Sequence, residues 1–340
     1  MEQDHIDASI RRVLESVAGG PGRDAAVEIK PLRGGLEAAA VAQVTARYRD
    51  HEGRSRTTRF VVKQLTGRPA REALIYQRLV SAHAAHMSPR LLAVDRPARD
   101  LTLLYLERIR RVSAWVWRDI AAGRKLLTQL AEFHQRAAEA PESVRDWDYE
   151  AEHRDLAVET RDALDRCRQD ADLSVLARAL PATDRIVRAR DRLRSQLRSE
   201  RGFQARPIHG DVHPGNAVVR RRQRADQPVL LDWARARIGS PLEDVGSWLQ
   251  SLGFWEPEVR RRHDALLRHY LTAYGMEDRL LPHIRATYWL AGASNALSGA
   301  LLHHLRTAGD ATQSLKQRSL SFDAAQAWLR VIRRADAYWS

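Results

Sequence analysis

The sequence predicts an α+β protein with two lobes: a small lobe built on an antiparallel sheet and a larger, mostly helical lobe. Over roughly the first 107 residues, strand-like and helix-like patterns alternate. From Ser113 onward, apolar residues recur at helical spacing. We therefore expect an amino-terminal lobe of residues 1–107 and a carboxy-terminal lobe of residues 108–340. Ligands commonly bind between such lobes.

The smaller lobe is expected to contain several short strands and one helix. Strands are indicated by alternating apolar residues between turn residues, and the helix by an apolar face at helical spacing. In chain order these elements are strands at 28–32, 40–48 and 58–65, a helix at 72–82, and strands at 90–95 and 101–107.

The larger lobe is expected to be helical except for one β-hairpin. Strand-like residues 217–220 and 229–231 flank a polar turn and predict that hairpin. The predicted helices cover 123–138, 152–169, 181–200, 242–252, 258–274, 282–307 and 320–338.

Composition is that of a soluble globular protein, with 340 residues, 44% hydrophobic and 29% charged. No apolar run approaches the roughly 20 residues that span a bilayer, and no leader-like segment opens the chain. The single cysteine, Cys167, excludes an internal disulfide. We expect a cytoplasmic protein without a membrane partner. The residues give no indication of an oligomeric state.

The net charge of +13 raises the question of nucleic-acid binding. The basic residues are scattered from Arg11 to Arg334 instead of forming a cluster, and no nucleic-acid recognition motif is present. We therefore interpret them as a solvated surface and expect no nucleic-acid partner. Only four of the 56 basic residues are lysines, and Lys63 lies in an apolar strand. This placement indicates a need for a compact ammonium group.

The most informative motif covers residues 208–216, Ile-His-Gly-Asp-Val-His-Pro-Gly-Asn, and is followed after the hairpin by Asp232-Trp233. Phosphoryl transfer from ATP requires metal ions on the phosphates and a carboxylate near the acceptor hydroxyl. Magnesium prefers oxygen ligands, which Asn216 and Asp232 could supply. Asp211 precedes Asn216 by five residues and could face a hydroxyl. The alternative is a structural turn whose Asp caps a helix.

These residues resemble the catalytic motif of the aminoglycoside phosphotransferase and choline kinase family, which has the two-lobed protein-kinase fold. The resemblance implies an ATP- and magnesium-dependent small-molecule kinase, with GTP as an open alternative donor. It implies that Asp211 is the catalytic base and that Asn216 and Asp232 are the magnesium ligands. The family's later Pro-x-x-Asp matches Pro241 and Asp244, which, together with His209 and His213, would support the catalytic loop.

In the smaller lobe, the resemblance implies five nucleotide contacts and an ion pair. Lys63 would contact the α- and β-phosphates, and Glu72 would pair with it. The alternatives are a sheet-edge lysine and a carboxylate favoured by a helix dipole. The remaining nucleotide contacts would be Gly34 and Gly35 in a phosphate loop, and the backbone of Leu106 and Arg108 at the adenine. The Gly-Gly pair could equally be a plain hairpin turn, and Glu37 beside it departs from the family pattern.

The family's acceptors include aminoglycosides, other antibiotics, amino-alcohols and sugars. Between Asp146 and Asp165, eight acids face two arginines. Such a patch could hold a polycation, with Glu152 and Asp155 as candidate contacts, or it could be a solvated helix face. Trp255 could stack on an acceptor ring or belong to the core. An aminoglycoside-like antibiotic is the first expectation, which would imply antibiotic resistance; an amino-alcohol or sugar is the alternative.

Two other function classes are compatible with an ATP-binding fold. A protein kinase would need a long activation segment, but only residues 233–240 separate Asp232 from Pro241. A non-catalytic ATP-binding module normally lacks the lysine, the base or the metal ligands, and Lys63, Asp211, Asn216 and Asp232 are all present. We therefore favour the small-molecule kinase.

Overall fold

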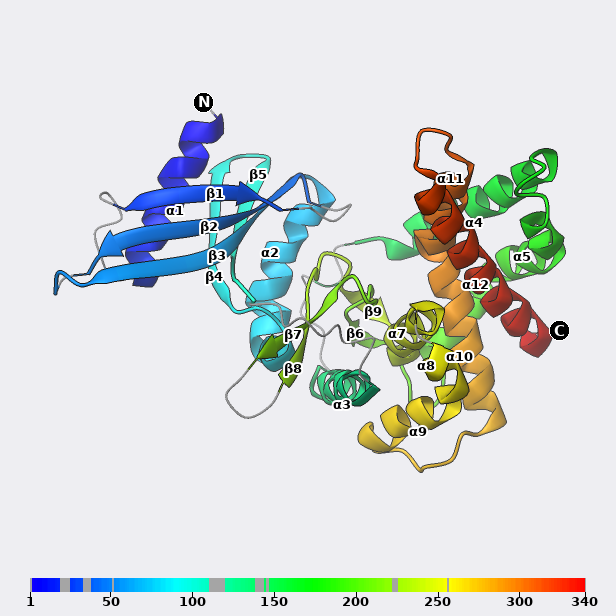
Figure 1. Ribbon diagram of the computed structural model, residues 1–340. Helices are drawn as coiled ribbons and strands as arrows, with labels where there is room; N and C mark the ends of the chain where they lie inside the picture. Colours follow the sequence, from blue (N-terminus) through cyan, green and yellow to red (C-terminus); the bar gives the residue numbers. More distant parts are fainter. Residues whose placement is uncertain are drawn as a thin grey trace. The chain divides into compact units, whose positions relative to one another are not determined.

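The computed structural model describes residues 2–18, 25–32, 38–50, 52–109, 120–137, 144, 147–221, 226–255 and 257–339. The chain divides into two compact units. Unit 1 comprises Met1–Ser113 and Val218–Arg235, and unit 2 comprises Ala114–Ala217 and Ala236–Ser340. The sequence placed a boundary near residue 107; the structure divides the chain after Ser113 and also assigns the segment from Val218 to Arg235 to unit 1 (Figure 1).

Unit 1 is built on a five-stranded antiparallel sheet in the order β1-β2-β3-β5-β4. Lys63 in β3 lies opposite Val41 of β2 and Leu104 of β5, so it is on an interior strand and not on a sheet edge. The strands are β1 Ala26–Pro31, β2 Ala40–Arg49, β3 Ser55–Leu65, β4 Leu91–Ala98 and β5 Leu101–Glu107.

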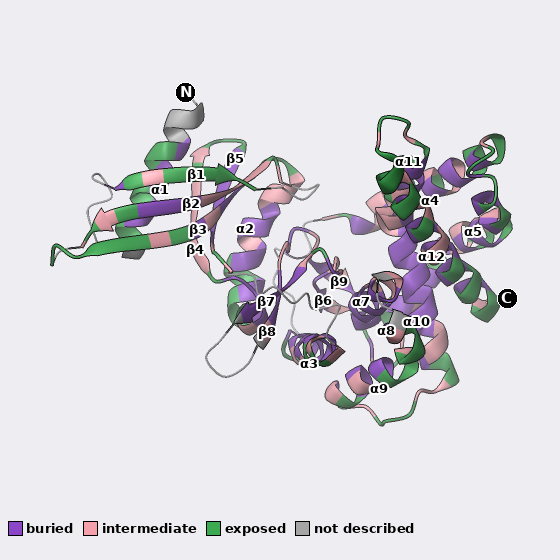
Figure 2. Ribbon diagram, in the orientation of Figure 1, coloured by how far each residue is buried: buried purple, intermediate pink, exposed green. Residues whose placement is uncertain are grey.

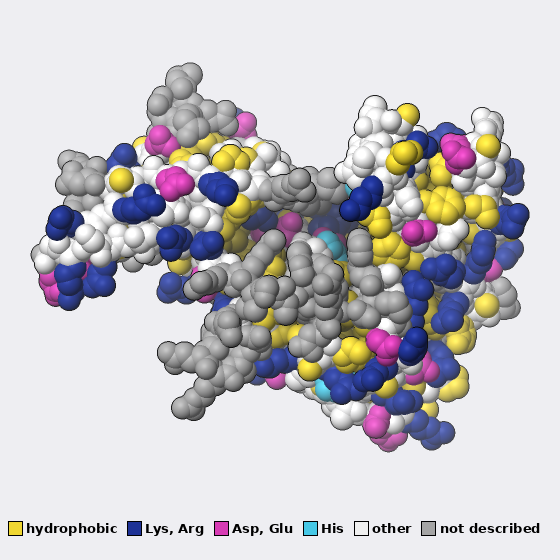
Figure 3. Space-filling view, viewed as in Figure 1, with side chains coloured by type: hydrophobic (Ala, Val, Ile, Leu, Met, Phe, Trp, Pro, Cys, Tyr) yellow, Lys and Arg dark blue, Asp and Glu magenta, His cyan; other side chains and the backbone are white. Residues whose placement is uncertain are grey.

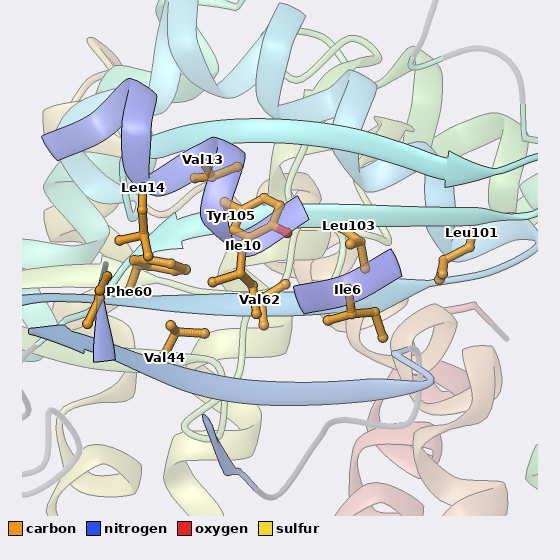
Figure 4. Close-up of a cluster of buried hydrophobic side chains, with 12 residues drawn as sticks. Ile6, Ile10, Val13, Leu14, Val44, Phe60, Val62, Leu101, Leu103 and Tyr105 are labelled. Atoms are coloured by element: carbon orange, nitrogen blue, oxygen red, sulfur yellow. The ribbon is translucent and has the colours of Figure 1, made fainter. Parts of the chain in front are cut away.

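A helix that the sequence analysis missed, α1 (Glu2–Ala18), covers part of this sheet. Its apolar positions recur at helical spacing and pack on buried side chains of β2, β3 and β5 (Figure 4). Two polar contacts accompany the packing: Ser9 hydrogen-bonds the Tyr105 hydroxyl at 2.6 Å, and Arg12 pairs with Asp95. The helix residues in this core are Ile6, Ile10, Val13 and Leu14.

The predicted helix at 72–82 begins as α2 (Glu72–Ile75) and continues as a π-helical segment, Tyr76–Ala84. The predicted hairpin is formed by β7 (Ala217–Arg221) and β8 (Asp226–Leu230). Arg220 on β7 donates hydrogen bonds to the Ser88 carbonyl and to Glu107, each at 2.9 Å. These bonds explain why the hairpin belongs to unit 1, although it lies far along the chain.

Unit 2 is mostly helical, and several predicted helices are interrupted. The helix predicted at 181–200 divides at Ala189, and the one at 282–307 contains a kink at Ser298 and Gly299, where φ reaches 115°. The helices are α3 Ile120–Arg136, α4 Tyr149–Arg166, α5 Leu180–Arg188, α6 Arg190–Ser199, α7 Pro241–Trp255, α8 Pro257–Arg261, α9 His263–Ala273, α10 Pro282–Asn295, α11 Leu301–Gly309 and α12 Leu315–Trp339.

The core of unit 2 forms around α7 and α10, which are largely buried (Figure 2). A short ladder that the sequence did not predict pairs β6 (Arg206–Ile208) with β9 (Arg237–Gly239). Ile208 lies opposite Arg237, so the ladder ends where the His209 loop begins. Among the helices that the structure describes, none is long and apolar enough to cross a membrane.

Candidate active site

Three predicted site residues meet in unit 1. The Lys63 ammonium donates to Glu72 Oε2 at 2.5 Å and to Asp232 Oδ1 at 3.1 Å. Lys63 comes from β3, Glu72 begins α2, and Asp232 follows the β7–β8 hairpin. Lys63 is 7% exposed and Glu72 is fully buried. The predicted Lys63–Glu72 pair is therefore present, and its carboxylate contacts the lysine directly instead of only capping a helix.

Burial and charge determine the protonation of this cluster. Burial disfavours the charged lysine, but Glu72 and Asp232 outweigh it and hold the pKa of Lys63 above its ordinary value. For Glu72, burial raises the pKa, Lys63 opposes that shift, and Asp232 reinforces it. The three side chains together carry one more negative charge than positive charge. Such a cluster favours the approach of a cation.

The backbone at Asp232 is unusual. Among the described residues, Asp232 is the only one other than glycine with a positive φ, at 61°. This conformation is strained for a residue with a Cβ, and such strain gathers at functional sites. It is held by two hydrogen bonds to the following residues: Trp233 N–H donates to Glu72 Oε1 at 3.0 Å, and Arg71 donates to the Ala234 carbonyl at 3.1 Å.

The loop of residues 209–216, which we call the catalytic loop, belongs to unit 2. Asn216 donates through Nδ2 to Asp211 Oδ2 at 2.9 Å and to the Asp211 carbonyl at 3.1 Å. The Asp211 side chain is 36% exposed, so its carboxylate is fixed yet accessible. The two residues predicted to act together are therefore in direct contact. Since Nδ2 faces Asp211, the Asn216 carbonyl oxygen is the atom of that amide available to a cation.

His213 lies beside this pair. Its Nδ1 accepts from Gly215 N–H at 3.0 Å, and its Nε2 is 3.6 Å from Asp211 Oδ2. A Cβ at Gly215 would come within 2.6 Å of the His213 ring, so only glycine fits there without displacing the ring. This close approach gives a physical reason for the His-Pro-Gly-Asn order.

Asp244, at the start of α7, holds the backbone of the catalytic loop by hydrogen bonds. Its carboxylate accepts from the backbone N–H groups of His209 and Gly210, each at 2.8 Å, and contacts His134 Nε2 at 3.1 Å. Burial raises the pKa of Asp244, but these hydrogen bonds and the charges of His134 and His209 outweigh burial, so its pKa lies below the ordinary value. His209 in turn accepts from Asp211 N–H through Nδ1. The predicted contact between Asp244 and this loop is present.

The structure describes two of the predicted nucleotide contacts at the sheet, Leu106 and Arg108, but not the two glycines. Leu106 lies within β5, opposite Val61 of β3 and Leu91 of β4, and is 5% exposed. Arg108 is exposed just beyond the end of β5. Gly34, Gly35 and Glu37 lie outside the described residues, as does the side chain of Trp255.

Four described acids of the run from Asp146 to Asp165 form ion pairs with arginines of unit 2. Glu150 pairs with Arg190 at 2.7 Å and with Arg194 at 2.9 Å. Glu152 accepts from the indole N–H of Trp147 at 2.9 Å, and Asp155 is exposed. Further ion pairs join Glu159 to Arg306, Asp162 to Arg161, and Asp165 to Arg168. Asp146 lies outside the described part of the chain.

Sequence reasoning missed three residues close to the catalytic loop. Arg237 donates to the Gly210 carbonyl, Glu243 binds Arg237, and His134 binds Asp244. Arg237 could not be distinguished in the sequence from the many other arginines. Glu243 could have been found from the sequence, since it directly precedes Asp244 in a turn that opens a helix. Outside these three, His304 on α11 is a half-buried histidine that the sequence did not single out; burial, with the charges of His303 and His213, lowers its pKa to about 4.

The fold agrees with solved structures of small-molecule kinases. An ethanolamine kinase of Plasmodium vivax matches with a TM-score of 0.59 and 12% identity, over 91% of this chain and 83% of that chain. A spectinomycin phosphotransferase matches with a TM-score of 0.58 and 14% identity, over 97% and 98%. A choline kinase of Streptococcus pneumoniae matches with a TM-score of 0.54 and 13% identity, over 96% and 99%. These likenesses confirm the protein-kinase-like α+β fold.

Family membership follows from the sequence itself. Residues 28–287 match the phosphotransferase enzyme family, and the chain belongs to that family. No curated protein matches the chain. The protein is accordingly a small-molecule kinase with an alcohol group as acceptor, and the resemblance drawn from residues 208–216 and 232–233 is confirmed.

Proposed function

We propose that this kinase transfers the γ-phosphoryl group of ATP to a hydroxyl of a small molecule, with Asp211 as the general base. The observation that carries the proposal is the pairing of Asp211 with Asn216. The Asp211 carboxylate is accessible, and Asn216 holds one of its oxygens by a hydrogen bond. Such a carboxylate suits a group that must receive a proton in a fixed direction.

In the proposed step, the acceptor hydroxyl gives its proton to the Asp211 carboxylate as its oxygen attacks the γ-phosphorus. The new O–P bond forms while the bond between the γ-phosphorus and the bridging oxygen breaks, and ADP leaves. Asn216 keeps one carboxylate oxygen oriented through its Nδ2. Gly215 allows His213 to lie beside the same carboxylate. Asp244 holds the backbone that precedes the base.

We assign ATP binding to unit 1, with Lys63 as the cation that contacts the α- and β-phosphates. Two carboxylates keep this lysine charged and directed despite its burial. Asp232 and Asn216 would hold magnesium, because they offer a carboxylate and an amide oxygen, the donors that this hard ion prefers. The excess negative charge around Lys63 fits a cation at Asp232. When bound, magnesium would neutralise charge on the phosphate oxygens.

For the acceptor, we propose first a hydroxylated antibiotic of the aminoglycoside kind. The likeness to a spectinomycin phosphotransferase over nearly the whole chain supports this class. A second candidate, an amino-alcohol or a sugar, is favoured by a specific observation. Four acids of the run that was expected to attract a polycation, Glu150, Glu159, Asp162 and Asp165, pair with arginines of this chain. A small acceptor needs no such patch.

A direct screen separates these acceptors. Purified protein is incubated with magnesium and either ATP or GTP, and with spectinomycin, hygromycin B, choline, ethanolamine or a hexose in turn. Each mixture is assayed for ADP or GDP and, by mass spectrometry, for the phosphate ester. We expect one class of acceptor to give ester and nucleoside diphosphate in equal amounts. Diphosphate without any ester across a wide panel would contradict the proposal.

A further inference from the structure

A buried ionic network in unit 2 reaches the backbone of the catalytic loop. Its inner end is Arg237, which is 2% exposed and lies on β9 opposite Ile208. Because β6 ends at Ile208, the Arg237 side chain is beside the residues that follow. Its Nη1 donates to the Gly210 carbonyl at 2.8 Å. Gly210 directly precedes Asp211.

The peptide group between Gly210 and Asp211 is held at both of its polar atoms. Arg237 binds the carbonyl oxygen, and His209 Nδ1 accepts from the Asp211 N–H at 3.2 Å. The Gly210 N–H on the other side is bound by Asp244. Gly210 has a φ of 81°, a conformation that glycine adopts freely. Because glycine has no side chain, it makes no side-chain contact that would hold this conformation. These hydrogen bonds therefore define the direction in which the Asp211 side chain leaves the backbone.

The guanidinium of Arg237 is itself fixed on three sides. Its Nη2 donates to Glu243 Oε2 at 2.8 Å, and its Cζ lies 3.9 Å from the centre of the Tyr149 ring. Arg194 donates to the same Glu243 oxygen at 2.7 Å and to Glu150 at 2.9 Å. The chain of contacts thus runs from α4 and α6, through Glu243 at the start of α7, to the catalytic loop.

We propose that Arg237 is a positioning residue for phosphoryl transfer: it fixes the Gly210–Asp211 peptide so that the Asp211 carboxylate keeps its productive direction. The inference rests on the proposed role of Asp211 as the base. A planar guanidinium can bind the Gly210 carbonyl and Glu243 at once, which a single ammonium cannot do with the same geometry. Displacing a reacting group by about 1 Å can cost on the order of 10²-fold in rate.

The test uses the full-length protein with Arg237→Gln and Arg237→Lys. The matched control is Arg190→Gln, since Arg190 is also buried, at 5% exposed, and pairs with Glu150 in the same network. Within the described part of the chain, the other contacts of Arg190 are His153, Asp191 and the Glu150 carbonyl, and none of these lies in the catalytic loop. Both glutamine variants remove one buried positive charge, so general loss of stability should be similar.

The first readout needs no acceptor. Hydrogen–deuterium exchange of a peptide covering 203–219 is compared at conditions where each variant is folded. We expect faster exchange of this peptide in Arg237→Gln, a smaller change in Arg237→Lys, and wild-type exchange in Arg190→Gln. The second readout is turnover with water as the acceptor and, where the screen yields one, with that acceptor, alongside calorimetric binding of Mg·AMP-PNP. We expect turnover to fall by on the order of 10²-fold in Arg237→Gln while nucleotide affinity and the KM for ATP stay unchanged.

Different outcomes overturn different claims. Wild-type exchange of the 203–219 peptide in Arg237→Gln would overturn the positioning role, whatever the activity. Equal acceleration in Arg190→Gln would reduce Arg237 to one member of a network that only stabilises unit 2. Faster exchange with unchanged turnover would show that the peptide is fixed by Arg237 but that its direction does not govern the reaction. If Asp211→Asn is also fully active, the failure lies in the proposed base and not in Arg237.

Discussion

Each unit buries a cluster of charged side chains, and the two clusters are balanced differently. In unit 1, Lys63 faces two carboxylates, Glu72 and Asp232, so negative charge is in excess. In unit 2, two buried arginines, Arg194 and Arg237, face the buried carboxylate of Glu243, so positive charge is in excess there. Arg194 and the buried Arg190 also pair with Glu150, which is 31% exposed.

The pKa of the buried glutamate in each cluster shows this difference in charge. In unit 1, burial and a neighbouring carboxylate raise the pKa of Glu72. In unit 2, burial also acts on Glu243, but Arg194 and Arg237 outweigh it and lower its pKa to about 2. Two carboxylates around one lysine suit a further cation, whereas Glu243 is already held between two arginines. We therefore assign ligand binding to the first cluster and support of the catalytic loop to the second.

The largest expected effect is on nucleotide binding. Asp232→Ala should abolish the magnesium-dependent part of ATP binding, and Asn216→Ala should weaken it less, because a carboxylate neutralises charge that an amide only coordinates. Isothermal calorimetry with AMP-PNP, with and without magnesium, measures both. Wild-type affinity that does not respond to magnesium would remove the basis for a metal site at Asp232.

The second prediction compares the two buried glutamates by stability. Glu243→Gln should lower the free energy of unfolding by about 3 kcal/mol, because the folded state favours ionised Glu243 by a pKa shift from 4.5 to about 2. Glu72→Gln should cost less, because it removes the excess negative charge. Urea unfolding followed by circular dichroism compares the variants. Equal losses at the two positions would contradict the difference in balance.

A smaller effect concerns pH. His153 accepts from Arg190 and contacts the Ser294 carbonyl; burial, with the charges of Arg194 and Arg190, lowers its pKa to about 3. A pKa below the unfolded value of about 6.5 means that neutral His153 stabilises the fold above that pH. That contribution is lost progressively as the pH falls toward about 3.

His153→Gln tests this dependence, since an amide can keep both contacts without titrating. Between pH 7 and pH 5 the stability of the wild type should fall by up to about 2 kcal/mol more than that of His153→Gln. His283→Gln, which replaces an exposed histidine, is measured alongside as the control. If the free energies of unfolding of the wild type and of His153→Gln fall equally with pH, His153 is not the source of this pH dependence.

Much of unit 1 was predictable because its signals are local. Strand alternation and turn residues located all five strands of the sheet, and the rarity of lysine drew attention to Lys63. Helix α1 was missed although Ile6, Ile10, Val13 and Leu14 recur at helical spacing. The π-helical widening after Ile75 depends on packing within the fold, which the period of the apolar residues does not report.

The charges of unit 2 were harder to predict because their partners are distant in sequence. The acids on α4 appeared as a patch, but Glu150 is paired with arginines about 40 positions later and Glu159 with Arg306. The scattered arginines were interpreted as a solvated surface. On the visible face, Lys and Arg side chains do spread over both units (Figure 3), but Arg190, Arg194 and Arg237 are buried. The Arg237 contact required the β6–β9 ladder, whose three-residue strands are too short to show a pattern.

The central claim is that Asp211 receives the acceptor's proton and does not hold the nucleotide. The most direct measurement is turnover of Asp211→Asn together with its affinity for Mg·AMP-PNP, on the same folded sample and with the acceptor identified by the screen. The account predicts a turnover lower by about 10²–10⁴-fold, the usual contribution of a general base, and unchanged affinity. Turnover near that of the wild type would contradict it.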